Sequence, residues 1–142
     1  MRHNLILTRA AELNALPAFG DFIKRMCAEF NISQHTCFAL QLACEEAAMN
    51  VIQHGYAGMN PGSLMLELRP SPNQIVMVIS DFGHPFEPSE PTAPDVNALL
   101  EDKPTTGFGL YFIYQTMDHV DYYSDEQGNH LVLTKHLPGP TN

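Results

Sequence analysis

Two pairs of short apolar segments, each joined by a brief loop, constrain the fold of this chain more than any other feature. Residues 64–69 and 74–80 have the pattern of strands flanking a proline-containing loop at residues 70–73. Residues 120–124 and 130–135 form a second such pair across a loop that contains glycine. Strands joined this closely pair antiparallel, because a parallel pair needs a long crossover. The chain therefore predicts a mainly antiparallel sheet.

Two helices are expected ahead of these pairs, after a first strand at residues 4–8. Apolar residues recur at helical spacing from about residue 11 to residue 30, and Pro17 is expected either in the first turn of this helix or at its true start. Ser33 has the chemistry of an N-cap for a second helix that runs to about His54, where Gly55 suits a helix end.

A proline-rich segment separates the two strand pairs. Five of the eleven prolines lie between residues 81 and 106, and a third helix is expected behind them, over residues 110–117. Such a segment inside a compact domain usually carries function, and we expect a lid at about residues 84–106. Strands grouped in hairpins predict an α+β fold: a two-layer α/β sandwich, with a mainly antiparallel sheet and helices on one face, in a single domain over residues 1–142.

Charge and cysteine content narrow the class of protein. The net charge is −9, with only seven lysines and arginines and no basic cluster, so direct nucleic-acid binding is not expected. No apolar run reaches the length of about 18 residues that a membrane span needs, and the N-terminus does not resemble a signal peptide. The three cysteines lack CxxC spacing, which is typical of reduced, buried cysteines in a cytoplasmic protein.

A carboxylate and a carboxamide stand close to the apolar side of the second expected helix. Glu46 and Asn50 are four residues apart and therefore share a face. Glu46 can act as a general base, and Asn50 offers a neutral oxygen to a hard cation such as Mg²⁺. Taken alone, this spacing is more often the solvated edge of a helix.

The second motif, Asp81-x-Gly83, ends an apolar strand. A carboxylate beside a glycine that permits close backbone approach can accept a hydrogen bond from the exocyclic amine of a base. The Asp-x-Gly pattern is also common in ordinary turns at strand ends.

The third motif comprises Thr106, Gly107, Gly109 and Leu110 and opens the third expected helix. Glycine N–H groups and a helix N-terminus bind phosphate well, although a hinge with a helix cap has the same composition. The motif does not follow a strand of a βαβ unit, which excludes a Rossmann site, and the chain lacks a P-loop motif.

In this order the three motifs resemble the superfamily of gyrase-type ATPases, histidine kinases and MutL, which has the Bergerat ATP-binding fold. Glu46–Asn50 matches its N box, Asp81–Gly83 its first glycine box and Gly107–Leu110 its second. Within it, the chain is most similar to the bacterial anti-sigma-factor serine/threonine kinases of the partner-switching type. This similarity covers nearly the whole chain and rests on residues 46–56, 81–86, 107–110 and 117–120.

The resemblance implies a role for each motif residue, with ATP and Mg²⁺ as cofactors. Glu46 would deprotonate a serine or threonine hydroxyl of a protein substrate, and Asn50 would ligate Mg²⁺. Asp81 would read the adenine amino group, with Gly83 leaving room for the ring. The residues that would line the phosphates are Thr106, Gly107, Gly109 and Leu110.

The resemblance also implies partners. The expected function is phosphorylation of an anti-anti-sigma protein with a STAS domain, together with sequestration of a sigma factor, by a homodimer. The alternative is a nucleotide-binding regulatory module without phosphotransfer, because Thr105 and Thr106 stand where family members often carry a basic residue, and the nearest cation is Lys103. Glu45, beside Glu46, leaves a second candidate for the base.

Overall fold

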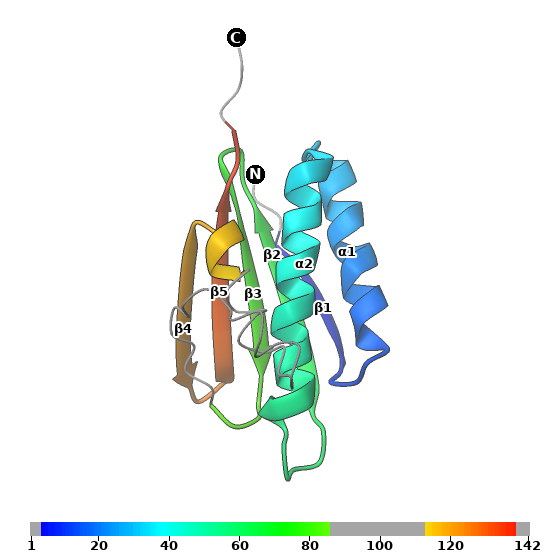
Figure 1. Ribbon diagram of the computed structural model, residues 1–142, viewed down its shortest axis with the longest axis vertical. Coiled ribbons are helices and arrows are strands. Elements are labelled where there is room, and N and C mark those ends of the chain that lie inside the picture. Colours follow the sequence, from blue (N-terminus) through cyan, green and yellow to red (C-terminus); the bar gives the residue numbers. More distant parts are fainter. Residues whose placement is uncertain (1–3, 86–112, 139–142) are drawn as a thin grey trace, which may run out of the picture.

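The computed structural model describes residues 4–85 and 113–138. Within these ranges the chain folds into a five-stranded sheet with two long helices on one face (Figure 1). The predicted α+β sandwich is confirmed. In chain order the elements are β1 Leu5–Ala10, α1 Ala15–Glu29, α2 Gln34–Asn50, the π-helical turn η1 Val51–Gly55, β2 Ser63–Pro70, β3 Gln74–Asp81, β4 His119–Asp125 and β5 Gly128–His136.

The strand order across the sheet is β1-β2-β3-β5-β4, and each neighbouring pair is antiparallel. The two predicted hairpins are β2–β3 and β4–β5. In the second hairpin β5 pairs with β3, so β5 lies inside the sheet and β4 forms its edge. The register places Asn129 of β5 directly opposite Asp81 of β3.

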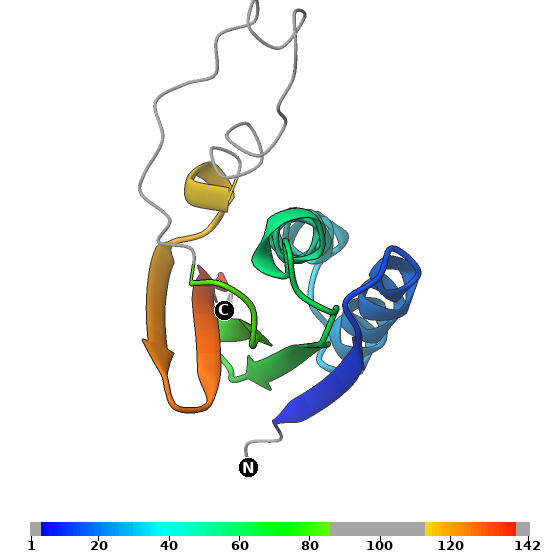
Figure 2. The same ribbon diagram turned by 90° about the horizontal axis from the view of Figure 1, so that it is seen from below.

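The core lies between the sheet and the two helices, which lie side by side over it (Figures 1 and 2). Alternate residues of β2 point into this layer, so Leu64, Leu66 and Leu68 are buried while Met65 and Glu67 between them are only partly covered. Each large aliphatic side chain buried in this way contributes about 1.5–3 kcal/mol to folding.

Helix α1 begins at Ala15, four residues after the start of the helical pattern and with Pro17 in its first turn, which is one of the two positions expected for that residue. The reason is tertiary: the N–H of Ala11 donates to the carbonyl of Gly62 (2.9 Å), which ties the end of β1 to the segment before β2. Pro17 then lies in the first turn of the helix, where its missing N–H costs no helical hydrogen bond.

Helix α2 starts as predicted, because the Ser33 hydroxyl oxygen accepts a hydrogen bond from the Thr36 N–H (3.1 Å) and caps the first turn. Its end differs from the prediction. Regular α-helix stops at Asn50, and residues Val51–Gly55 form a π-helical turn where an α-helix to about His54 was expected. Single π turns of this kind occur often at functional sites.

Several predictions fall outside the described residues. Of the expected lid at residues 84–106, only His84 and Pro85 are described, and Thr106, Gly107, Gly109 and Leu110 lie outside the description. Of the third helix, residues 113–116 are helical. The three cysteines are free and buried, as predicted. No helix in the described ranges is long and apolar enough to cross a membrane.

Candidate functional site

The π turn that follows α2 and the segment just after β3 meet through their backbones. The His84 N–H donates to the carbonyl of Gly55 (2.6 Å), and the His84 Nε2 donates to the carbonyl of Ala57 (2.8 Å). Gly83 lies so close to Gly55 that a Cβ on Gly83 would overlap the Gly55 carbonyl group. The structure thus brings the Glu46–Asn50 helix and the Asp81-x-Gly83 motif together at one end of the sandwich.

The Asp81 carboxylate is held by one oxygen. Asp81 is 7% exposed, and its Oδ1 accepts hydrogen bonds from the Gly83 N–H (2.7 Å) and from the Asn129 side-chain amide (3.0 Å). Among the described residues nothing donates to Oδ2. A carboxylate oxygen that is fixed in place but has no donor is suited to accept from a bound molecule.

The Tyr56 hydroxyl fastens the end of the π turn to the sheet. It donates to the Ser63 carbonyl at the start of β2 (2.7 Å) and accepts from the Phe82 N–H just after β3 (2.9 Å). Burial raises the pKa of Tyr56, so the hydroxyl keeps its proton and remains a donor. This one side chain therefore ties the residue after the π turn both to the start of β2 and to the residue just after β3.

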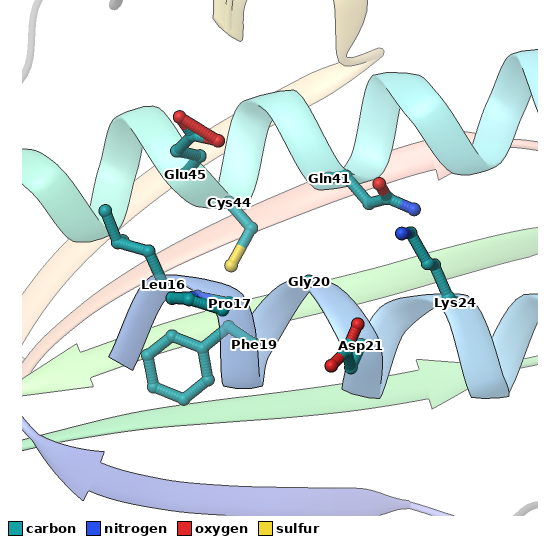
Figure 3. A pocket seen from close by; sticks show the side chains of 9 residues that line it. All are labelled: Leu16, Pro17, Phe19, Gly20, Asp21, Lys24, Gln41, Cys44 and Glu45. Atoms are coloured by element: carbon teal, nitrogen blue, oxygen red, sulfur yellow. The ribbon is translucent and has the colours of Figure 1, made fainter. Parts of the chain in front are cut away.

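Glu45 and Glu46 lie on opposite flanks of α2. Glu45 lines a groove of about 370 Å³ between α1 and α2, with the buried Cys44 thiol in the same groove (Figure 3). Successive helix residues are about 100° apart, so Glu46 and Asn50 lie on the other side of the buried stripe, away from α1. Figure 2 shows the helical turn at residues 113–116 on that side of α2, above the same face of the sheet.

Glu46 is partly buried, and the pKa of its carboxyl group is raised, first by burial and then by the negative charge of Glu45. A carboxylate with a raised pKa is a better proton acceptor near neutral pH than an ordinary glutamate. In the described part of the chain its carboxyl group has no hydrogen-bond partner.

The donor set suits a metal ion that arrives with a nucleotide. Asn50 is partly buried, and none of the described residues hydrogen-bonds its carboxamide. The described ranges contain no group of three or more His, Cys, Asp or Glu residues that could hold a metal ion alone. Mg²⁺ in phosphate-transfer sites is commonly held by one or two protein oxygens together with substrate phosphates and water, and Asn50 fits such a role.

Four residues that the structure places around Asp81 have no predicted site role: Gly55, Tyr56, Gly128 and Asn129. Gly55 was expected only to end a helix, and Tyr56 only as one residue of the similar segment 46–56. Gly128 and Asn129 were expected only in the loop of the second hairpin. Their positions depend on contacts with residues far away in the chain, and the local pattern carries no signal for them beyond the glycines.

Comparison with known proteins is consistent with this geometry. The family model described as the histidine kinase-like ATPase domain matches residues 9–135. The serine/threonine-protein kinase BtrW of Bordetella bronchiseptica is 29% identical over 99 residues, which cover 70% of each protein. The serine-protein kinase RsbW is 30% identical in Listeria monocytogenes and 28% in Bacillus cereus, over 102 residues each.

These alignments cover 69% of this chain but only 64% and 62% of the two RsbW proteins, so the chain spans less than two thirds of their length. The matched region includes the helix end and the strand end that meet at Asp81. The resemblance to partner-switching kinases is confirmed by these relatives, and the chain belongs to the family of histidine kinase-like ATPase domains.

Proposed function

We propose that this protein is an ATP-dependent serine/threonine protein kinase and anti-sigma factor. Its substrate would be an anti-anti-sigma protein with a STAS domain, and it would sequester a sigma factor when that antagonist is absent. The observation that carries the proposal is the contact between the π turn that follows the Glu46–Asn50 helix and the segment around Asp81-x-Gly83, made by the His84 N–H and the Gly55 carbonyl (2.6 Å). The names of the kinase relatives support the same reaction.

Asp81 is proposed to select the base. Its Oδ2 is available to accept a hydrogen bond from the exocyclic amine of adenine, while Oδ1 is held by protein donors. Gly83 fits beside this carboxylate because it has no side chain: a Cβ there would overlap the Gly55 carbonyl group and lie 3.2 Å from Asp81 Oδ1. Thr106, Gly107, Gly109 and Leu110 are proposed to line the phosphates.

Glu46 is proposed as the general base. The serine or threonine oxygen of the substrate forms a bond to the γ-phosphorus, the bond from that phosphorus to the β-phosphate oxygen breaks, and ADP leaves with the electron pair. The hydroxyl proton passes to the Glu46 carboxylate, whose raised pKa favours the transfer. Asn50 would hold Mg²⁺, which neutralises phosphate charge when bound.

The proposed partners agree with the charge of the chain. A net charge of −9 favours association with a basic surface on a protein partner and disfavours nucleic acid. A cytoplasmic location and a homodimer are part of the same proposal, because both belong to the resemblance on which it rests.

Calorimetric titration with ADP and Mg²⁺ tests nucleotide binding directly. We expect binding by the wild type and its loss in Asp81→Asn, because the amide would place a donor or a weaker acceptor before the adenine amine. Binding that is equal in the two proteins would refute the role of Asp81. If ATP binds but no phosphoprotein forms, the alternative is supported: a nucleotide-binding regulatory module, for which Thr105 and Thr106 in place of a basic residue argue.

A further inference from the structure

Asn129 joins the β4–β5 hairpin to both ends of the Asp81 turn. It is 4% exposed, and its side-chain NH₂ group donates to Asp81 Oδ1 (3.0 Å) and to the Gly83 carbonyl (2.9 Å). An amide NH₂ has two hydrogens, and both are directed to acceptors of the same turn. The Asp81 carboxylate and the Gly83 backbone are therefore held in one arrangement by a residue 48 positions away from Asp81.

The orientation of the Asn129 amide is itself fixed. The Ser124 hydroxyl of β4 donates to Asn129 Oδ1 (2.8 Å), so the NH₂ end must face Asp81. A rotated amide would lose this bond and would point its oxygen at the Asp81 carboxylate. Ser124, Asn129 and Asp81 thus form a directed chain of donors and acceptors.

The hairpin can reach Asp81 because of Gly128. Its φ is +113°, which a residue with a side chain rarely adopts, and a Cβ there would overlap the Asp81 carbonyl oxygen. Figure 1 shows the β4–β5 hairpin beside β3, with β5 as its direct neighbour. Close approach of the backbones is what puts the Asn129 side chain within hydrogen-bond distance.

From these contacts we infer that Asn129 is a positioning residue, which fixes the Asp81 carboxylate so that Oδ2 alone faces the base and thereby sets the preference for a 6-amino purine. The inference rests on the proposed nucleotide site and adds a determinant of specificity to it. With Oδ1 occupied by the Gly83 N–H and the Asn129 amide, only Oδ2 is available to accept from the adenine amine. Without Asn129 the Asp81 carboxylate can rotate. The difference in binding free energy between a purine with the 6-amino group and one without it then becomes smaller.

A second set of bonds holds the hairpin independently of Asn129. On the opposite face of the sheet His130 Nδ1 is 2.8 Å from the Ser80 hydroxyl oxygen, and His130 Nε2 is 2.9 Å from Asp125 Oδ1. The backbone pairing of β3 with β5 runs from residue 74 to residue 81. Replacing the Asn129 side chain should therefore leave the strands paired.

The experiment compares Asn129→Leu with the wild type, using two nucleotides with Mg²⁺: ADP, and purine riboside diphosphate, which lacks the amine. We expect ADP to bind about tenfold more weakly to the variant, since one charge-assisted hydrogen bond that orients Asp81 is lost. The affinity for purine riboside diphosphate should change little, so the ratio of the two dissociation constants should narrow by about tenfold. Asn129→Thr, which keeps one donor, should recover part of the ratio.

Asn73→Leu, at the opposite end of β3, is the matched control and should leave both affinities unchanged. An equal loss of affinity for the two nucleotides, or no loss, would overturn the role of Asn129. A residue that only supports the fold changes the fraction of protein able to bind nucleotide and leaves the ratio of the two dissociation constants unchanged. Should Asn129→Leu fail to fold, Ser124→Ala removes only the bond that orients the amide and should narrow the ratio to a smaller degree; an unchanged ratio in that variant would also overturn it. Failure of the wild type to bind ADP at all would refute the nucleotide site instead.

Discussion

The Cα atom of Gly83 lies against the backbone carbonyl of Gly55, with no room between them for a side chain. This contact joins a helix end and a strand end that are almost thirty positions apart in the chain, and the adjacent His84 N–H completes it with a hydrogen bond to the same carbonyl. The two motifs that sequence reasoning treated separately are thus one structural unit.

Gly83→Ala should destabilise the protein by about 1–3 kcal/mol, because the added methyl group forces the two backbone segments apart. The affinity for ADP should fall as well, since the Asp81 turn moves with Gly83. Urea unfolding and calorimetry measure the two effects.

Gly20→Ala is the matched control for this change. Gly20 lies within α1, where an added Cβ meets nothing within 4 Å, so the substitution should raise the stability by about 0.5–1 kcal/mol through helix propensity. A Gly83→Ala protein as stable as the Gly20→Ala protein would show that the two backbones are not in contact.

Tyr56→Phe should cost about 1–3 kcal/mol, because it leaves the Ser63 carbonyl and the Phe82 N–H without their partner. Thermal unfolding measures the loss. Tyr123→Phe is the control: this side chain is 49% exposed, and its substitution should change the stability by less than about 0.5 kcal/mol. Equal effects of the two substitutions would argue against the Tyr56 tether.

Much of the fold follows from local patterns. The N-cap at Ser33 and the two hairpins depend on residues close together in the chain, and each is as predicted. Local patterns left the start of α1 open between about residue 11 and Pro17, because the hydrogen bond of the Ala11 N–H to Gly62 is a contact that no local pattern indicates.

The π turn was missed for a similar reason. Residues 51–55 fit an α-helix by composition, and the wider turn accompanies the contacts of Gly55 with Gly83 and His84. Asn129 could not be assigned either, since its role follows from the pairing of β5 with β3 opposite Asp81, whereas the sequence indicated only that β4 and β5 pair with each other.

Glu46→Gln should retain binding of Mg²⁺ and ATP and should lose phosphoryl transfer by about 10²–10⁴-fold, the usual contribution of a general base. In the wild type the rate should fall as the pH falls through the raised pKa of Glu46, because only the carboxylate accepts a proton. A pH–rate profile for both proteins measures this. A wild-type profile that stays flat down to the pKa of an ordinary glutamate would contradict the assignment.

Glu46→Gln, which should lower the rate of phosphoryl transfer, should raise the stability of the fold at neutral pH. Because folding raises the pKa of Glu46, its contribution to stability is present below the pKa of the unfolded chain and is lost as the pH rises through the folded pKa. Glu46→Gln should therefore be more stable than the wild type at pH 7, by about 0.5 kcal/mol or less for this partly exposed group, and equal to it in acid. Urea unfolding at pH 7 and pH 4 tests the sign.

Asn50→Ala should abolish the dependence of ATP affinity on Mg²⁺, because the neutral oxygen proposed to hold the ion is removed. Calorimetric titrations with Mg²⁺ and with EDTA measure this dependence. Asn60→Ala, in the exposed segment before β2, should keep it. An undiminished Mg²⁺ effect in Asn50→Ala would exclude Asn50 as the ligand.

Transfer of phosphate to a protein is the central claim, and mass spectrometry of the candidate substrate tests it most directly. A candidate STAS-domain protein would be incubated with Mg²⁺ and ATP and with the wild type, Glu46→Gln or Asp81→Asn. We predict one added phosphate on a serine or threonine with the wild type and almost none with either variant. The proposed kinase function would be contradicted if the wild type binds ATP but leaves the substrate unmodified. The role of Glu46 would be contradicted if Glu46→Gln modifies the substrate at the wild-type rate.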